Sequence, residues 1–182
     1  MTSDIVQLQQ NLNKPVVFVG LMGAGKTEMG QAFAKIMGWK CVDSDDVIIE
    51  RAGMSIPEIF EKYGEPHFRE LERQVVADLL AQEKTVISLG GGAVMQVQTA
   101  ALVWEKSTSI WLNADLATLL DRTSRDDNRP LLRDGDPREI LSELLEKRSP
   151  VYSKASITVD SNGSQDVVLN NIIQGLKAHL KL

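Results

Sequence analysis

The apolar positions of this chain fall into two alternating patterns. Short runs that include valine, isoleucine and leucine are typical of buried parallel strands. Between them, apolar residues recur every three or four positions, as in amphipathic helices. We therefore expect strands at residues 16–19, 40–43, 85–89, 109–112 and 156–159. We expect helices at residues 25–37, 94–103, 115–122, 137–147 and 167–180.

Two stretches depart from this alternation. The polar residues 1–14 predict a frayed lead-in with no more than one weak helical turn. Residues 46–82 carry no strand pattern, only helical pieces, and Ser55 with Glu58 forms the capping-box pattern of a helix start. Strands that alternate with helices predict a parallel sheet covered on both faces, an α/β fold. In such a fold the ligand binds outside the carboxyl ends of the strands.

The link between the first strand and the first helix carries the clearest chemical signal. It reads Gly20-Leu21-Met22-Gly23-Ala24-Gly25-Lys26-Thr27, a full match to G-x-x-x-x-G-K-[ST]. Glycines let backbone N–H groups converge on a phosphate, and the helix start adds N–H donors and the positive end of a dipole. We expect Lys26 to reach the β- and γ-phosphates of a nucleoside triphosphate and Thr27 to bind Mg²⁺.

Carboxylates and glycines follow the next two predicted strands. Asp43 and Asp45 come after the second strand, where one can face Mg²⁺ and the other a hydroxyl that must lose a proton. Alternatively, Ser44 or Asp45 only caps the following helix. The third strand leads into residues 90–92, three glycines, which indicate close approach to the backbone or positive φ. We expect a bare backbone platform against a small substrate, with a strained turn as the alternative.

Three arginines are candidates for anion binding, although each could also be a solvated surface residue. Arg69 lies on a predicted helix, where Glu72 one turn away can hold its guanidinium. Arg129 belongs to residues 123–136, a charged stretch with little to bury that predicts a mobile lid. An arginine on such a lid stabilises the charge of a transferring phosphoryl group. Arg148 can bind a substrate carboxylate through two N–H groups.

Composition excludes several function classes. The chain has 182 residues, of which 43% are hydrophobic and 25% charged, which suits one α/β domain. The net charge of −5 argues against a nucleic-acid binder. Cys41 is the single cysteine, so no intrachain disulfide can form. With no signal-peptide pattern and no apolar run of membrane length, we expect a cytoplasmic protein with no membrane partner. We also expect a monomer.

In their order along the chain, these motifs resemble the shikimate kinase family. From about residue 15 to residue 160 the matching segments are Gly-Leu-Met-Gly-x-Gly-Lys-Thr, Asp-Ser-Asp, Ser-Ile-x-Glu-Ile-Phe, Gly-Glu-x-x-Phe-Arg-x-x-Glu, Gly-Gly-Gly, Arg-Pro-Leu-Leu and Arg-x-Pro-x-Tyr. The resemblance implies a nucleoside-monophosphate-kinase-like αβα P-loop fold, with a five-stranded parallel sheet in the order 2-3-1-4-5. It implies one kinase domain over residues 1–182, with substrate-binding helices at about 45–82 and a lid at about 123–136.

The resemblance further implies ATP-dependent phosphorylation of the 3-hydroxyl of shikimate, a step of aromatic amino-acid biosynthesis. Thr27 and Asp43 would hold Mg²⁺, Asp43 through water, and Arg122 with the turn at residues 160–163 would hold the adenine. The remaining nucleotide contacts would come from Gly23, Ala24, Gly25, Lys26, Glu28 and Arg129.

On the substrate side, the resemblance implies that Asp45 binds the shikimate hydroxyls and is the candidate base. Arg69 and Arg148 would bind the carboxylate, and Gly90, Gly91 and Gly92 would line the ring. Arg129 would reach both phosphate and substrate from the lid. Catalysis would thus rest on Lys26, Asp45 and Arg129.

Glu28 departs from the family pattern, in which serine or threonine often follows Gly-Lys-[Ser/Thr]. A carboxylate near phosphates is unfavourable unless it turns outward or pairs with a base. We expect Glu28 to point away from the phosphates, toward a lysine or arginine on the lid side.

Two rival functions fit part of the pattern. A gluconate-type sugar-acid kinase shares the P-loop fold and the lid. The run of three glycines and the pair of Arg69 and Arg148 favour shikimate instead. A catalytically silent nucleotide-binding module would use the same scaffold. Intact Lys26, Asp43, Asp45 and Arg129 argue against that alternative.

Overall fold

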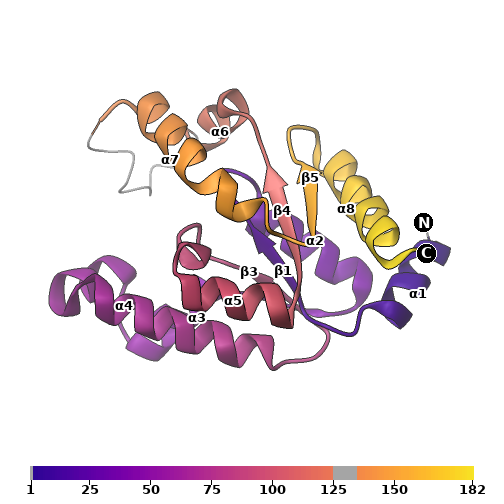
Figure 1. Ribbon diagram of the computed structural model, residues 1–182, viewed down its shortest axis with the longest axis horizontal. Helices are drawn as coiled ribbons and strands as arrows, with labels where there is room; N and C mark the ends of the chain where they lie inside the picture. The colour runs from indigo at the N-terminus through magenta and orange to yellow at the C-terminus, as the bar shows by residue number, and fades with distance from the viewer. Residues whose placement is uncertain (1, 125–134) are drawn as a thin grey trace.

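The computed structural model describes residues 2–124 and 135–182. Its centre is a five-stranded parallel sheet in the order β2-β3-β1-β4-β5, which confirms the expected order (Figure 1). The strands are β1 (Val16–Val19), β2 (Lys40–Asp43), β3 (Thr85–Ser88), β4 (Thr108–Asn113) and β5 (Ile157–Asp160). β1 and β3 are buried along their whole length, as their continuous apolar runs predict, whereas the edge strands β2 and β5 are partly exposed.

Helices cover both faces of the sheet. α1 (Thr2–Asn11), α2 (Lys26–Met37) and α8 (Gln165–Leu180) pack on one another on one side (Figure 1). The other helices are α3 (Ser44–Ala52), α4 (Ile56–Leu80), α5 (Val97–Lys106), α6 (Leu116–Thr123) and α7 (Pro137–Tyr152). Of these, α3, α4 and α5 pack in sequence, and α6 packs on α7. None of the helices in the described ranges combines the length and the apolar character that a membrane crossing requires.

The first residues form a full helix, α1, where we expected a frayed lead-in. Leu8 is completely buried, and the side chain of Gln9 donates a hydrogen bond of 2.8 Å to the carbonyl of Met37 on α2. Lys177 on α8 forms an ion pair with Asp4. The segment is too short and polar to be a stable helix alone, so its order comes from packing on α2 and α8. That tertiary contribution leaves little trace in the local pattern.

The helices between β2 and β3 begin and break where the sequence predicts. Ser55 and Glu58 form the predicted capping box at the start of α4. Gly64, with φ of 81° and ψ of 170°, interrupts the helical geometry two residues before Pro66, so α4 consists of two segments. The predicted helix at 94–103 is different, because a short 3-10 turn, η1 (Ala93–Met95), precedes α5.

The helix α7 extends beyond its predicted end at residue 147 to Tyr152. We expected Arg148 to follow the helix, but the helix continues through Pro150. The proline stands in the last turn, so it removes one hydrogen bond near a helix end rather than in the interior. The consequence is that Arg148 and Tyr152 lie one turn apart on a rigid element.

Candidate active site

The phosphate-binding loop lies between β1 and α2, at the carboxyl edge of the sheet. Gly20, Gly23 and Gly25 have φ of 145°, 80° and 91°, which favour glycine. A Cβ at Gly20 would come within 2.8 Å of the carbonyl oxygen of Leu112, so this position also excludes a side chain for lack of space. Because α2 begins at Lys26, directly after Gly25, its first amides face the loop and form an anion-binding site.

Asp43 connects this loop to the second strand. The Thr27 hydroxyl donates a hydrogen bond of 2.9 Å to Asp43 Oδ2 and lies 3.4 Å from Ser88 Oγ. The other oxygen of Asp43 accepts a bond of 3.0 Å from the amide of Asp45, so Asp43 is the N-cap of α3. The alternative in which Ser44 or Asp45 caps this helix is therefore wrong. A single carboxylate caps the helix and contacts the P-loop threonine.

Thr27 and Asp43 also fit the predicted magnesium site. Their hydroxyl and carboxylate oxygens are the hard ligands that Mg²⁺ prefers, and they already lie within hydrogen-bond distance of each other. Within the described residues no group of three or more histidine, cysteine, aspartate or glutamate side chains could hold a metal ion. Two protein oxygens suit an ion that takes its other ligands from phosphates and water, as Mg²⁺ does beside nucleotides.

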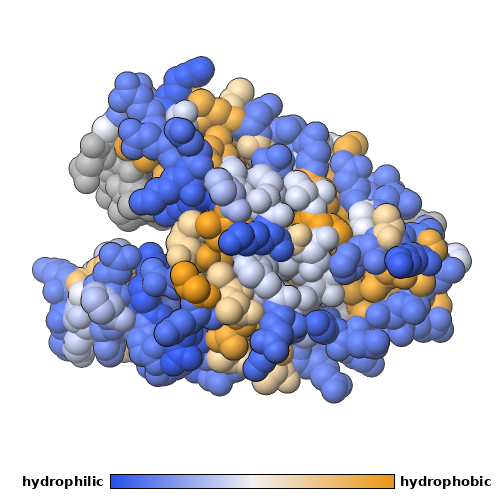
Figure 2. All heavy atoms as spheres, in the orientation of Figure 1, coloured by the Kyte–Doolittle hydropathy of each residue, from blue (hydrophilic) through white to orange (hydrophobic). Residues whose placement is uncertain are grey.

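A cavity of about 490 Å³ opens beside the P-loop. Figure 2 shows the molecule hollowed between the helices α3 and α4 on one side and α7 on the other. Four separate stretches of the chain line this cavity: the P-loop, the start of α3, the helix α4 and the turn after β3. Arg148 of α7 closes it from the opposite side. The cavity therefore joins the phosphate cradle to a second, charged compartment.

Asp45 is half-buried at the boundary between the two compartments. Burial, together with the nearby charge of Asp43, raises the pKa of its carboxyl to about 6. Lys26 and Arg69 act in the opposite direction. A Cβ at Gly90 would come within 2.7 Å of Asp45 Oδ1, so the turn after β3 lies directly against this carboxylate.

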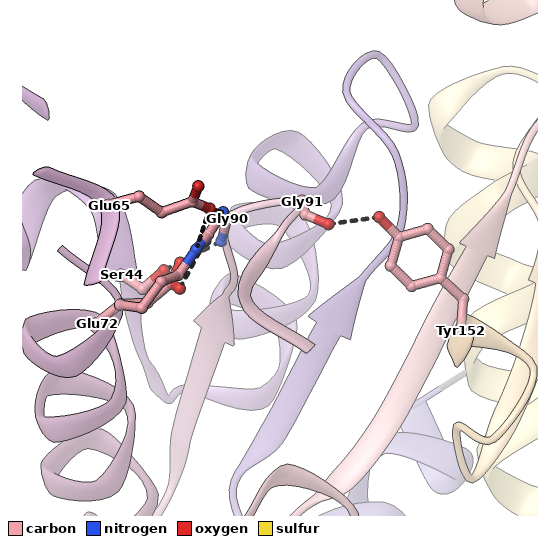
Figure 3. A network of polar contacts seen from close by, with 7 residues as sticks. Ser44, Glu65, Glu72, Gly90, Gly91 and Tyr152 are labelled. Carbon is pink, nitrogen blue, oxygen red and sulfur yellow. Dashed lines mark hydrogen bonds and ion pairs between the residues drawn. The ribbon is translucent and has the colours of Figure 1, made fainter. Parts of the chain in front are cut away.

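Two glutamates of α4, Glu65 and Glu72, which are labelled in Figure 3, hold Arg69 of the same helix in place. Its Nη1 donates to Glu72 at 2.9 Å, and its Nε and Nη2 donate to Glu65 at 3.2 Å. Glu72 is only 1% exposed, and burial raises the pKa of its carboxyl while Arg69 lowers it. A buried carboxylate that is paired in this way fixes the guanidinium at the cavity wall. This arrangement matches the expected role of Glu72.

The three glycines after β3 lie close to charged side chains, and backbone conformation does not require them; the approach is closest at Gly90 and Gly92, and at Gly91 a Cβ would make an ordinary contact. None of Gly90, Gly91 and Gly92 has positive φ. A Cβ at Gly91 would lie 3.4 Å from Arg148 Nη1, and one at Gly92 would lie 3.1 Å from Arg69 Nη2. Together with the contact of Gly90 on Asp45, each glycine thus faces a different charged side chain of the cavity.

An apolar wall of this cavity was not foreseen. Ile56, Phe60 and Phe68 of α4 line it, and the two phenylalanine rings lie 4.7 Å apart between centroids. Phe60 is 36% exposed, which is high for an aromatic side chain on a packed helix. The sequence of α4 did contain a signal for this wall. These residues make the apolar face of the helix wider than packing against the core requires. Only the fold shows that they face the cavity.

A second cavity, of about 250 Å³, lies on the other side of the P-loop. Arg122 spans it: its Nη2 donates to the carbonyl of Ser161 at 2.7 Å, and its Nη1 lies 3.4 Å from the carbonyl of Gly23. The structure thus brings together Arg122 and the turn at residues 160–163, as expected for a base-binding site. Its size and position beside the P-loop suit the base of a nucleotide.

Glu28 is exposed and lines both cavities. In residues 2–124 and 135–182 it forms no ion pair, so pairing with a lysine or arginine of the lid stays a prediction. Arg129 and most of the expected lid lie outside the described residues.

A P-loop at the carboxyl edge of a parallel sheet, with a cavity on each side of it, is the arrangement of a small-molecule kinase of the αβα P-loop class. The comparisons with known proteins identify the family. The model of the family described as "Shikimate kinase" matches residues 22–177 of this chain. A shikimate kinase of Novosphingobium aromaticivorans is 41% identical over 180 residues, covering 96% of this chain and 93% of that protein. The chain belongs to the shikimate kinase family.

Solved structures agree with this assignment. The shikimate kinase of Acinetobacter baumannii, determined in complex with shikimate, is similar with a TM-score of 0.84 and 33% identity over 97% of both chains. A gluconokinase of Sinorhizobium meliloti has a TM-score of 0.62 at 16% identity, covering 94% of this chain and 95% of its own. At that identity the gluconokinase shares the fold alone, so the rival sugar-acid kinase gains no functional support.

Proposed function

We propose that this enzyme transfers the γ-phosphoryl group of ATP to the 3-hydroxyl of shikimate, giving ADP and shikimate 3-phosphate. The observation that carries the proposal is the cavity beside the P-loop, where Asp45, Arg69 and Arg148 surround residues 90–92. Membership of the shikimate kinase family supports the same reaction. The reaction is a step of aromatic amino-acid biosynthesis.

The chemistry of the substrate matches the walls of the cavity. Shikimate carries one carboxylate and three hydroxyls on a six-membered ring. Arg69 and Arg148 bind the carboxylate, because two guanidinium groups offer paired N–H donors to its oxygens. The ring lies against residues 90–92, where the absence of side chains leaves room, and against the apolar wall of α4. The hydroxyls then face Asp45.

On the nucleotide side, the amides of residues 23–27 bind the phosphates and Lys26 reaches the transferring group. Thr27 and Asp43 would hold Mg²⁺, which would offset the negative charge of the phosphates. Arg122 lies against the adenine. Arg129 approaches from the lid and stabilises the charge that spreads over the transferring phosphoryl group.

Asp45 orients the attacking hydroxyl and accepts its proton. With a pKa of about 6 its carboxylate is mostly ionised at neutral pH, yet it is a stronger base than an ordinary aspartate. In a loose phosphoryl-transfer transition state the proton leaves late. Positioning of the hydroxyl in line with the γ-phosphate is therefore the larger part of its contribution.

We further propose that residues 1–182 act as one kinase domain, with substrate-binding helices at about 45–82 and a lid at about 123–136. We propose a monomer located in the cytoplasm. The acidic composition and the single cysteine support this location.

The test is to identify the reaction product. The enzyme is incubated with shikimate and ATP in the presence of Mg²⁺, and the product is analysed by mass spectrometry and by proton–phosphorus correlation NMR. The proposal predicts a monophosphate with phosphorus coupled to the proton at carbon 3. A phosphate on another hydroxyl, or unreacted shikimate in the presence of ATP hydrolysis, would contradict it.

A further inference from the structure

A third cavity, of about 590 Å³, lies between α4 and the start of α5, two helices that pack on each other (Figure 1). Its α4 wall consists of Glu65, Pro66, Arg69, Glu70 and Arg73, and its α5 wall consists of residues 96–99. Apart from Arg69, none of these residues lines the cavity beside the P-loop. A cavity of this volume accepts a small molecule, and the reaction proposed above leaves it unused.

The start of α5 offers free backbone donors to this third cavity. Gln96 occupies the N-cap position, and its side chain makes no capping hydrogen bond. The N–H groups of residues 97–99 have no acceptor in either described range. In a helix of ten residues such amides, together with the positive end of the dipole, attract an anion. A helix start of this kind is common, so it does not define a site by itself.

A buried hydroxyl without a partner marks the same place. Thr99, the third residue of α5, lines the third cavity and is completely buried. Its Oγ1 has no hydrogen-bond partner among the residues that the structure describes. Side chains on a helix lean toward the helix N-terminus, so this hydroxyl lies on the side of the free amides. Because an unpaired buried hydroxyl is unfavourable, a ligand oxygen at the helix start would supply the partner that the protein lacks.

The charged side chains favour a ligand with a single negative charge. Arg73 binds Glu70 through Nε and Nη2, and its Nη1 has no acceptor in residues 2–124 and 135–182. Glu65 and Glu70 lie in the same wall, so a doubly charged phosphate would be repelled. A carboxylate carries one charge, and its two oxygens accept hydrogen bonds from amides and from a guanidinium group.

The third cavity also has apolar surface. Val97 is 84% exposed, the highest value for a large apolar side chain in the described part of the chain. Pro66 lies in the α4 wall. An apolar ligand body that covers Val97 and Pro66 removes this surface from water, which favours binding.

We propose that the third cavity is a second binding site of the enzyme, for a small monocarboxylic acid with an apolar body. The carboxylate accepts hydrogen bonds from N–H groups at the start of α5, from the Thr99 hydroxyl and from Arg73 Nη1. The apolar body packs on Val97 and Pro66. The inference does not depend on which acceptor the kinase phosphorylates.

The test is a titration of the ¹⁵N-labelled enzyme with benzoate, followed by NMR. We expect saturable downfield shifts of the amide protons of Gln98 and Thr99, as hydrogen bonding to a carboxylate causes. Benzamide has the same ring and no charge, so it should leave both signals in place. The shifts should persist in Arg148→Ala, which lacks an arginine of the cavity beside the P-loop. Unmoved signals with benzoate, equal shifts with benzamide, or loss of the shifts in Arg148→Ala would overturn the proposal.

A second measurement tests the buried hydroxyl. Thr99→Val replaces the hydroxyl by a methyl group of similar size. Because Oγ1 has no partner in the described structure, we expect the melting temperature not to fall, whereas benzoate should bind about tenfold more weakly through loss of a hydrogen bond to a charged group. The control is Thr85→Val, a change of another buried threonine, which should leave the affinity for benzoate unchanged.

A lower melting temperature with unchanged affinity in Thr99→Val would show that the hydroxyl is structural and would overturn the proposal. None of these measurements involves phosphoryl transfer. Their failure therefore leaves the proposed function intact, and an enzyme that does not use shikimate would leave this second site intact.

Discussion

The two halves of the site are built in different ways. The phosphate cradle comes almost entirely from one continuous segment, residues 20–27, and needs only Asp43 from outside it. The acceptor compartment is assembled from the ends of α3 and α7, from α4 and from the turn after β3. The cradle binds groups that all nucleotides share, so a local motif suffices. The acceptor compartment must match one molecule from several sides, which no single segment can do.

If residues 20–27 carry the chemistry, substitution of Lys26 should have the largest effect on kcat. The substitution Lys26→Met should lower kcat by about 10³-fold, because it removes a preorganised positive charge from the transferring group. Steady-state kinetics with ATP and shikimate measures it. The control is Lys40→Met, which should leave kcat unchanged. Lys40 lies at the start of β2, at the end of the strand away from Asp43 and the site. A Lys26 variant with nearly normal kcat would assign the charge stabilisation to another residue.

The carboxylate between the two halves should have the next largest effect. Asp45→Asn keeps the size of the side chain but cannot take a proton from the hydroxyl, so we expect kcat to fall by about 10²-fold. The matched control is the exposed neighbour, Asp46→Asn, with kcat close to that of the wild type. Equal losses in both variants would point to a general effect of charge at the start of α3 and not to a base.

The acceptor compartment should respond in KM rather than in kcat. Arg148→Ala removes charged hydrogen bonds to the carboxylate, so the KM for shikimate should rise roughly 30-fold while the KM for ATP stays the same. Arg138→Ala, an exposed arginine in the first turn of the same helix, controls for the loss of charge. An unchanged KM for shikimate in Arg148→Ala would show that the carboxylate does not bind at this end.

Glu28 should have the smallest effect, because its side chain is exposed to solvent. Glu28→Thr removes a negative charge near the nucleotide, and screening in water limits the gain, so the KM for ATP should fall by about twofold at most. Glu105→Thr, exposed at the far end of α5, is the control. A higher KM for ATP in Glu28→Thr would mean that the carboxylate makes a favourable contact that the family's usual threonine cannot replace.

The difference between the two halves also explains what could be predicted from the sequence. The strands and the P-loop depend on contiguous residues, so their patterns located them to within one or two positions. The order of the strands is a matter of tertiary pairing and came only from the family resemblance. Arg69, Arg148 and residues 90–92 were found as separate motifs, but their convergence on one cavity is a property of the fold.

The errors have physical causes of the same kind. α1 is ordered by contacts with α2 and α8 that lie far away in the sequence. α7 continues past its predicted end at residue 147, through Pro150 to Tyr152. Ile56, Phe60 and Phe68 of α4 look like ordinary core residues by pattern. Only the fold shows that they line the cavity.

The most direct test of the account is an assay of ADP release with ATP and Mg²⁺, comparing shikimate, gluconate and no added acceptor. The assembled compartment, with its two arginines around a glycine turn, predicts turnover with shikimate and only background ADP release in the other two reactions. Turnover with gluconate at a similar kcat/KM, or ADP release that ignores the acceptor, would contradict the account. The P-loop fold would stand in either case, and the acceptor compartment would need a different ligand.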